Sequence, residues 1–346
     1  MMPKPKHLIA GTGITKPALN RSSGVATLRI RIHLDPRFRI QTMPSKRYPS
    51  VLLSTCPIPW TEDFALDEAL FRQTAARIAA KVSSHVYLFG TAGEGYAVTD
   101  QQFVQIVAVF KAALPEAARP MIGIISLSLG TIVERIETAR ALGFHDFQIS
   151  FPSWGPLTDI EVDRFFVATC GAFPDCRFLH YNLPRTKRLL VGSDYARLSE
   201  RHTNLVAIKM GGDEATLLDI VESAPALQLF VVEFGYAALR DRHECGFIAA
   251  VTAGKPEFAR AFFNARGAPL ASMLHEIKAA YRVLKAKVGE TDAHIDGAYD
   301  KMQAKMLVPE FPLRLLPPYS FVPDDVFEAF CAEAPPGWIN RKPGSP

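Results

Sequence analysis

Residues 205–213 read LVAIKMGGD, a short apolar run that carries one lysine near its end and then breaks on two glycines. Apolar runs of roughly four to eight residues bounded by glycine are typical of buried strands, so we predict a strand over 205–210. Lys209 then lies at the carboxyl end of that strand. Its amine is either a surface group that ends the strand or a nucleophile toward a carbonyl carbon. The neighbouring segments decide between these two interpretations.

Seven further strand-like runs alternate with helical patterns between residue 50 and about residue 265. The strand-like runs cover 51–54, 85–89, 121–125, 147–150, 178–181, 227–232 and 247–251. The helical patterns cover 66–82, 99–114, 131–142, 159–170, 194–201, 214–223 and 237–244. Eight strand–helix units without long hairpin loops are typical of a closed parallel barrel, so we predict the α/β class and a (β/α)8 TIM barrel. Helical patterns over 256–287, 295–306 and 324–332 follow and predict a C-terminal helical extension.

The chain divides into four predicted parts. These are a basic, disordered N-terminal extension (1–48), the barrel (49–265), a C-terminal helical region (266–332) and a loose tail (333–346). The extension holds ten Lys and Arg and one acid, whereas the remainder has a net charge of −5. A disordered segment, an Arg-rich targeting peptide and an over-long reading frame that truly starts at Met43 all fit this composition. We favour the non-structural extension.

Composition excludes several classes of function. The basic charge lies outside the predicted fold and the body is net acidic, which argues against nucleic-acid binding. No apolar segment approaches the roughly 18–20 residues of a membrane helix, so we expect no membrane partner. The five cysteines are scattered and form no CxxC pair, which favours a reducing compartment such as the cytoplasm over a disulfide framework or a zinc site. We find no HExxH motif and expect no metal.

The barrel prediction brings reactive groups together. In this fold the catalytic groups lie at the carboxyl ends of the strands and on the loops that follow. Those positions hold GTAGE at 90–94, PSW at 152–154, Tyr181 and Lys209. An amine, a phenol, a hydroxyl and a glycine-rich turn therefore converge on one mouth, and this convergence favours the nucleophile interpretation of Lys209.

Three motifs resemble those of the dihydrodipicolinate synthase / N-acetylneuraminate lyase family of class I Schiff-base aldolases. The stretch at 90–94 is similar to its G-[ST]-T-G-E turn, and YNLP at 181–184 is similar to its Y-N-x-P. The stretch IKMGGD at 208–213 is similar to its I-K-x-[ST]-x-G-[DN] strand. The motifs occur in the family's order and at similar spacing, and the likeness covers about 50–332.

The resemblance implies catalytic roles for three residues. Lys209 would attack the ketone of pyruvate or another 2-oxo acid and form an imine, which then acts as an electron sink. Tyr181 would carry protons to and from the substrate, and Thr91 would orient the Tyr181 hydroxyl. The covalent imine requires no cofactor. The resemblance also implies an aldehyde as the second small-molecule partner and a homodimer or homotetramer.

Further residues are implied in substrate binding. Backbone N–H groups around Ala92 and Gly93 would hold the substrate carboxylate, since such a turn presents donors without a counter-charge. Ile248 would line the pyruvate pocket. Arg185 is the candidate for binding the carboxylate of the aldehyde, although it comes one residue early. Trp154 occupies the loop in which the family often has a relay tyrosine supplied across a subunit interface.

Departures from the family pattern leave two functions open. Ala92 stands where many synthases have a second threonine, and Trp154 cannot pass a proton as the usual tyrosine does. The first interpretation is an active lyase, aldolase or hydratase-aldolase; the alternative is a catalytically impaired protein that binds a 2-oxo acid in a sensory or structural role. Five aromatic residues are expected at the mouth and suggest a less polar acceptor: Trp60, Phe151, Trp154, Phe234 and Tyr236.

Overall fold

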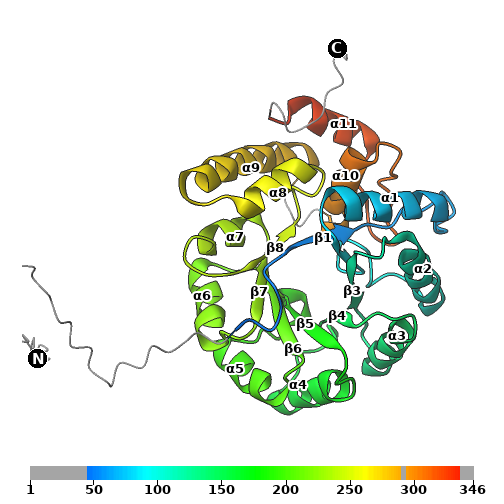
Figure 1. Ribbon diagram of the computed structural model, residues 1–346. Coiled ribbons are helices and arrows are strands. Elements are labelled where there is room, and N and C mark those ends of the chain that lie inside the picture. The colour runs from blue at the N-terminus through cyan, green and yellow to red at the C-terminus, as the bar shows by residue number, and fades with distance from the viewer. Residues whose placement is uncertain (1–44, 290–293, 336–346) are drawn as a thin grey trace, which may run out of the picture. The chain divides into compact units, whose positions relative to one another are not determined.

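Eight parallel strands form a closed barrel in the computed structural model, which describes residues 45–289 and 294–335 (Figure 1). Each strand pairs with the next along the chain, and β8 pairs with β1. The strands are β1 (Leu52–Cys56), β2 (His85–Leu88), β3 (Arg119–Ile124), β4 (Asp146–Ile149), β5 (Arg177–Asn182), β6 (Leu205–Met210), β7 (Gln228–Val231) and β8 (Gly246–Ala249). The predicted TIM barrel is confirmed.

Helices alternate with the strands and surround them (Figure 1). They are α1 (Glu68–Lys81), α2 (Asp100–Ala113), α3 (Leu129–Ala141), α4 (Asp159–Phe166), α5 (Gly192–Arg201), α6 (Glu214–Ser223), α7 (Glu233–Leu239) and α8 (Pro256–Asn264). A π-helical turn, η1 (Val167–Gly171), continues α4, and a short 3-10 helix, η2 (Pro184–Thr186), follows β5. Side chains fix several helix starts: Asp213 accepts a hydrogen bond from the N–H of Thr216 and so begins α6 just after β6.

Most helix boundaries shift by one or two residues from the sequence prediction, and two segments differ more. Helix α7 begins at Glu233 instead of residue 237, because the Glu233 carboxylate accepts hydrogen bonds from the Ala250 and Thr252 N–H groups and ties the first turn to the loop after β8. The pattern at 256–287 forms two helices, α8 and α9 (Gly267–Val288), instead of one. Pro269 accounts for the break, since its ring would clash with the carbonyl of Ala265 in a continuous helix.

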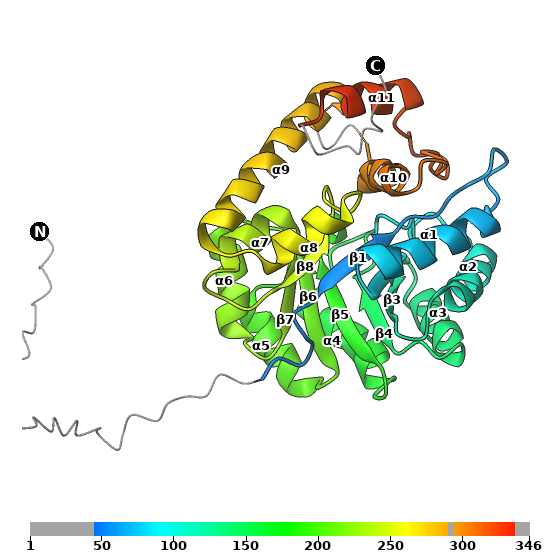
Figure 2. The ribbon, with the colours of Figure 1, turned by 45° about the horizontal axis from the view of Figure 1, so that its top comes forward.

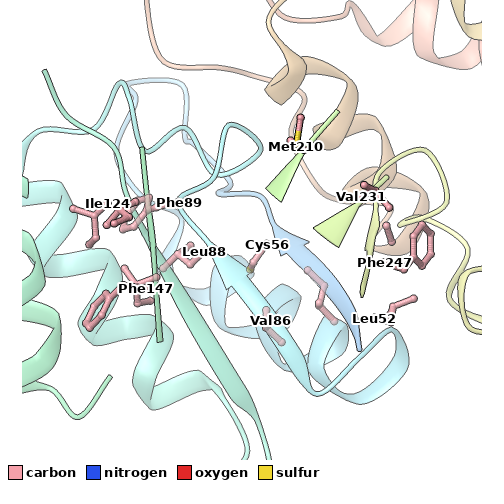
Figure 3. Close-up of a cluster of buried hydrophobic side chains, with 14 of the residues drawn as sticks. Leu52, Cys56, Val86, Leu88, Phe89, Ile124, Phe147, Met210, Val231 and Phe247 are labelled. Carbon is pink, nitrogen blue, oxygen red and sulfur yellow. The ribbon is translucent and has the colours of Figure 1, made fainter. Parts of the chain in front are cut away.

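Side chains on the strands divide between two apolar layers. Leu53, Tyr87, Leu179, Ala207 and Ile248 belong to a cluster inside the barrel. The other layer lies between the strands and the helices, and Figure 3 shows part of it, including Leu52, Val86, Met210 and Phe247. Successive side chains on a strand point to opposite faces. The inward position of Ala207 and the outward position of Met210 therefore place the Lys209 side chain inside the barrel mouth.

The C-terminal helices are α9, α10 (Asp296–Leu307) and α11 (Asp324–Glu333), as predicted for this region. Helix α9 packs against α7 and α11, and α10 lies on the side of the barrel where the strands end (Figure 2). The contact is close: a Cβ added to Gly297 of α10 would be 3.1 Å from the carbonyl oxygen of Thr91. Helix α10 thus covers part of the mouth.

The predicted domain boundaries stay predictions at both ends of the chain. Residues 1–44 of the expected extension and 336–346 of the expected tail lie outside the described residues. Residues 45–48 belong to the folded part, because Tyr48 is buried and its hydroxyl donates to Asp146. No helix of the described ranges has the length and apolar character of a membrane-spanning helix.

Candidate active site at the carboxyl end of the barrel

Lys209 and Tyr181 lie side by side at the mouth. They are partners in the register of β5 and β6, and both side chains point inward because Leu179 and Ala207, two residues earlier on each strand, lie in the inner cluster. The Lys209 Nζ is 4.0 Å from the centroid of the Tyr181 ring. The sequence predicted this pair, and the structure brings it together.

Tyr87 forms the floor beneath the Lys209 amine. The Nζ is 5.2 Å from the centroid of the Tyr87 ring, so two phenol rings flank one cation. The Tyr87 hydroxyl donates to Gln148 Oε1, and burial holds the pKa of Tyr87 well above its usual value. Tyr87 therefore stays a neutral phenol. The sequence does not predict this position, because the apolar run at 85–89 does not indicate that Tyr87 packs against a lysine of another strand.

The turn at 90–94 is strained and offers free donors. Phe89, just before the turn, and Glu94, its last residue, have φ values of 61° and 53°, in the left-handed region that non-glycine residues rarely adopt. Gly93 is required, since a Cβ there would lie 2.7 Å from the backbone nitrogen of Phe89. Within the part of the chain that the structure describes, no group accepts a hydrogen bond from the N–H of Thr91, Ala92 or Gly93. These donors match the predicted carboxylate cradle.

Glu94 ties this turn to the C-terminal region. Its carboxylate accepts hydrogen bonds from Trp60 Nε1 and from the Leu316 N–H, each at 2.7 Å, and forms an ion pair with Lys301 Nζ at 2.7 Å. Both charged side chains are fully buried. Burial lowers the pKa of Lys301 to about 8, and the Glu94 charge opposes that shift. Glu94 thus has a structural role, as one partner of a buried ion pair.

A cavity of about 260 Å³ opens beside the turn, and we call it the Thr91 cavity. Thr91, Phe151 and Arg185 are among the residues that line it. Arg185 forms a bidentate ion pair with Asp296 of α10, with both N–O distances at 3.0 Å. The predicted carboxylate-binding group is therefore already paired.

Trp154 does not join the other predicted site residues. Its side chain is 85% exposed, and its carbonyl accepts a hydrogen bond from Lys187 Nζ at 2.9 Å. Its role in substrate binding stays a prediction. Ile248, in contrast, is buried inside the barrel, with its partner Leu53 on β1.

The predicted aromatic mouth is wrong for two residues. Trp60 and Tyr236 are fully buried and bond to Glu94 and to the Phe263 carbonyl, respectively. Their large rings fill the packing outside the barrel instead of facing substrate. Phe151 lines the Thr91 cavity and Phe234 lines a second cavity.

The second cavity has a volume of about 230 Å³ and contains a carboxyl group that sequence reasoning missed. Asp300 of α10 lines it together with Glu233 and Asp296, and we call it the Asp300 cavity. Burial, helped by the Asp296 charge, raises the pKa of Asp300 to about 7, and the Lys209 charge opposes the shift. The four-residue spacing between Asp296 and Asp300 indicates that both lie on one face of a helix, but it does not indicate where in the fold that face lies.

Replacing Asp300 by asparagine should stabilise the protein at neutral and alkaline pH. Between pH 3.8 and about pH 7 the folded protein retains a proton that the unfolded chain releases, so the free energy of unfolding falls as pH rises through this window. A neutral amide at this position does not titrate and avoids this loss. We expect Asp300→Asn to gain roughly 1–2 kcal/mol over wild type at pH 8, less than the full pKa shift implies, because Asp300 is only partly buried.

Urea unfolding at pH 4 and pH 8 measures this difference. Asp325→Asn, which removes an exposed carboxylate from α11, is the control and should show no such pH-dependent gain. A gain at pH 4 as large as the gain at pH 8 would contradict the expectation.

Potential metal ligands lie elsewhere. Among the residues that the structure describes, His145, Asp175 and Cys176 form a group whose candidate atoms lie within 4.8 Å of one another. They precede β4 and β5 and so lie at the opposite end of the barrel from Lys209. Asp175 is already paired with Arg140, and nothing connects this group with the mouth.

Comparison with known sequences identifies the family. The sequence pattern of the dihydrodipicolinate synthetase family matches residues 49–275, which is most of the described chain. The chain belongs to this family. The family is one of Schiff-base, pyruvate-dependent lyases, and its members use a lysine without a cofactor. The match includes Lys209, Tyr181 and the turn at 90–94.

This family member is distant from its curated relatives. It is 27% identical over 159 residues to a 4-hydroxy-tetrahydrodipicolinate synthase of Acaryochloris marina, covering 46% of this chain and 54% of that protein. It is also 27% identical over 177 residues to the Moorella thermoacetica synthase, covering 51% and 60%. The chain thus spans about half the length of the curated relatives it matches.

Solved structures of proteins from several organisms share the barrel. YagE of E. coli K12, determined in complex with pyruvate, matches with a TM-score of 0.71 at 14% identity, over 81% of this chain and 95% of that one. An N-acetylneuraminate lyase of Proteus mirabilis gives 0.71 at 15% identity, over 82% and 97%. A dihydrodipicolinate synthase of Cyanidioschyzon merolae with lysine bound gives 0.70 at 19%, over 84% and 98%. These likenesses establish the fold.

Proposed function

We propose that the protein is a class I lyase or aldolase that joins Lys209 covalently to pyruvate or a related 2-oxo acid and then breaks or forms a carbon–carbon bond with an aldehyde partner. The observation that carries this proposal is the Lys209 amine, held inside the barrel mouth 4.0 Å from the Tyr181 ring. Membership in a family of Schiff-base lyases supports the same chemistry.

The first part of the reaction is capture of the 2-oxo acid. The free N–H groups of Thr91, Ala92 and Gly93 would receive its carboxylate, and the amine of Lys209 would attack the neighbouring ketone. Loss of water gives a protonated imine. Its positive charge withdraws electrons from the adjacent carbon, so a carbanion equivalent forms there at low cost.

The second part is reaction with the aldehyde. Tyr181 would exchange a proton with the oxygen of the aldehyde-derived carbon as the carbon–carbon bond forms or breaks. The Thr91 cavity would hold the aldehyde, and Arg185 would bind an acidic group on it after exchanging its partner Asp296 for the substrate. Ile248 would close the floor of the pocket. We propose a cytoplasmic homodimer or homotetramer and no metal or other cofactor.

One observation favours a second function. Arg185 is occupied by Asp296, so the chain offers fewer free ligands to an aldehyde than to the 2-oxo acid. A protein that captures a 2-oxo acid without turning over an aldehyde, as a sensor or structural subunit, would need no more than this.

Incubation with pyruvate and sodium borohydride should label the protein once, at Lys209. The hydride reduces the imine to a stable amine, and mass spectrometry of the intact protein and of its peptides locates the added group. Protein treated with borohydride alone is the control. Absence of a pyruvate-dependent adduct at Lys209 would rule out both functions. An adduct without turnover of any aldehyde in a panel would rule out the lyase or aldolase and support the sensor or structural role.

A further inference from the structure

The Asp300 cavity is lined by four elements of the fold. They are represented by Asp300 on α10, Tyr281 on α9, Phe234 on α7 and Val251 in the loop after β8. Helix α10 lies on the side of the barrel where the strands end (Figure 2). Lys209 is not among the described residues that line this cavity, so its ligand need not be the 2-oxo acid that Lys209 would capture.

Aromatic and aliphatic side chains form most of the lining. The rings of Phe234 and Tyr281 meet edge to face with their centroids 5.6 Å apart, and Tyr299 adds a third ring. Phe234 is 39% exposed although it is large and apolar, so its ring is open to a ligand. The volume of about 230 Å³ holds a compound of roughly ten non-hydrogen atoms, since one water takes about 30 Å³ of liquid.

The cavity is acidic and has one carboxyl group without a partner. None of the described residues that line it is a lysine, an arginine or a histidine. Asp296 is paired with Arg185, and the Glu233 carboxylate accepts from the N–H and the hydroxyl of Thr252. Asp300 forms no hydrogen bond or ion pair with any residue of the described ranges. The cavity therefore favours a positively charged ligand.

Gln303 supplies a second unpartnered group. Its side chain is only 3% exposed and lines the same cavity. The Oε1 atom accepts a hydrogen bond from the Gly254 N–H at 3.3 Å, which fixes the orientation of the amide. Among the described residues, none accepts from its Nε2. Buried polar groups are nearly always hydrogen-bonded, so this donor indicates an acceptor on a molecule that enters the cavity.

The spacing of these two groups restricts the ligand. Asp300 and Gln303 are three positions apart on α10, so their side chains are neighbours, with Cβ atoms about 5–6 Å apart. One side chain accepts from a cation and the other donates to an oxygen that lies close to that cation. A carboxylate oxygen would be repelled by the acidic lining, so the oxygen of the ligand should be uncharged.

We propose that the Asp300 cavity binds a small organic ammonium compound with an apolar or aromatic body and an uncharged oxygen, such as a hydroxyl or a carbonyl, near the ammonium group. The ammonium would donate to Asp300, and the oxygen would accept from Gln303 Nε2. The Phe234 ring would lie against the body of the ligand. This site goes beyond the proposed lyase function and does not depend on it, since no residue that forms the imine takes part.

The charge of Asp300 decides the pH of the test. Burial, helped by the charges of Asp296 and Glu233, raises the pKa of Asp300 to about 7, and the Lys209 charge opposes the shift. At pH 8 the carboxyl group is therefore mostly ionised. An alkylammonium group, with a pKa of about 10 like that of lysine, keeps its proton there.

Isothermal titration calorimetry of the full-length protein at pH 8, without any 2-oxo acid, tests the site with four compounds of similar size. They are 2-phenylethylamine, 2-amino-1-phenylethanol, 2-phenylethanol and 3-phenylpropanoate. Both amines should bind, and the amino alcohol should bind more tightly because it also reaches Gln303. The neutral alcohol and the anion should bind at least about 10-fold more weakly than the amines, because they offer Asp300 no positive charge.

Three variants locate the ligand. Asp300→Asn keeps the size of the side chain and should weaken both amines roughly 10- to 100-fold, the range for hydrogen bonds to charged groups. Gln303→Met removes the donor and should abolish the preference for the amino alcohol, while 2-phenylethylamine binds as before. Asp325→Asn on α11 is the control and should bind all four compounds as the wild type does. Circular dichroism melting shows whether each variant is folded.

The results either support or overturn the site. Absence of amine binding, equal binding of the neutral alcohol, or unchanged amine binding in Asp300→Asn overturns it. If Asp300→Asn is unfolded, Gln303→Met decides: a lost preference for the amino alcohol supports the site and a retained preference overturns it. Pyruvate labelling of Lys209 is measured separately, so its failure overturns the lyase alone, and failure of amine binding overturns this site alone.

Discussion

Arginine in place of Lys209 should leave the protein folded but unable to capture any 2-oxo acid. The guanidinium keeps a positive charge between the Tyr181 and Tyr87 rings, so the cation–π contacts persist. It cannot lose its proton in a protein and so cannot act as a nucleophile. We expect no adduct with pyruvate and borohydride and a fall in kcat/KM of at least about 10³-fold, as when a covalent nucleophile is removed.

A matched control exists in the same mouth. Lys187 donates its Nζ to the Trp154 carbonyl on the neighbouring loop, and Lys187→Arg keeps the charge and the hydrogen-bond donors. That variant should be labelled at Lys209 as the wild type is. A labelled peptide in Lys209→Arg would show that the ketone is bound to a residue other than Lys209. Loss of labelling in Lys187→Arg as well would mean that the loss in Lys209→Arg is not specific to Lys209.

Methionine in place of Lys301 should destabilise the protein by about 3–5 kcal/mol, the range for removing one partner of a buried ion pair. The Glu94 carboxylate would then be buried with hydrogen bonds from Trp60 and Leu316 but no counter-charge. Lys301 also donates to the carbonyls of Ile58 and Arg314, so two acceptors would lose their donor. Urea unfolding followed by circular dichroism measures the loss.

Lys305→Met provides the comparison one helical turn later on α10. Lys305 pairs with Asp324 at 3.1 Å, but Asp324 is largely exposed, so that pair should contribute less than about 1 kcal/mol. The double variant Glu94→Gln, Lys301→Met should recover part of the stability, because no unpaired charge remains buried. Equal losses in the free energy of unfolding for Lys301→Met and Lys305→Met would mean that the buried ion pair stabilises the protein no more than the exposed one.

The parts of the site that were predictable depend on local pattern. Lys209 and Tyr181 each end a short apolar run, and strand alternation together with the barrel is enough to point both inward. The turn at 90–94 could be recognised for the same reason, since its glycines sit directly after a strand. The residues that escaped prediction act across the fold. Asp300 is an ordinary helix residue in sequence, and only the placement of α10 over the strand ends brings it into the Asp300 cavity.

The same distinction explains the misplaced boundaries and pairings. Helix α7 starts early because Glu233 accepts hydrogen bonds from the loop after β8. The sequence around residue 233 does not indicate this contact. The sequence predicts that Arg185 binds substrate, but Asp296, which is 111 positions later, occupies its guanidinium. The break between α8 and α9 is different: Pro269 marks it locally, and the sequence pattern contained the information.

Helix α10 has a consequence for the order in which the site comes into being. A ribosome that adds roughly 5–20 residues per second needs several seconds to move from Lys209 to Asp300, about ninety positions later. During that interval a nascent barrel has Lys209 but not Lys301, which anchors the turn at 90–94. The turn at 90–94 therefore gains its buried counter-charge only after α10 has been synthesised and has packed over the strand ends. Completion of the barrel mouth thus waits for the synthesis of α10.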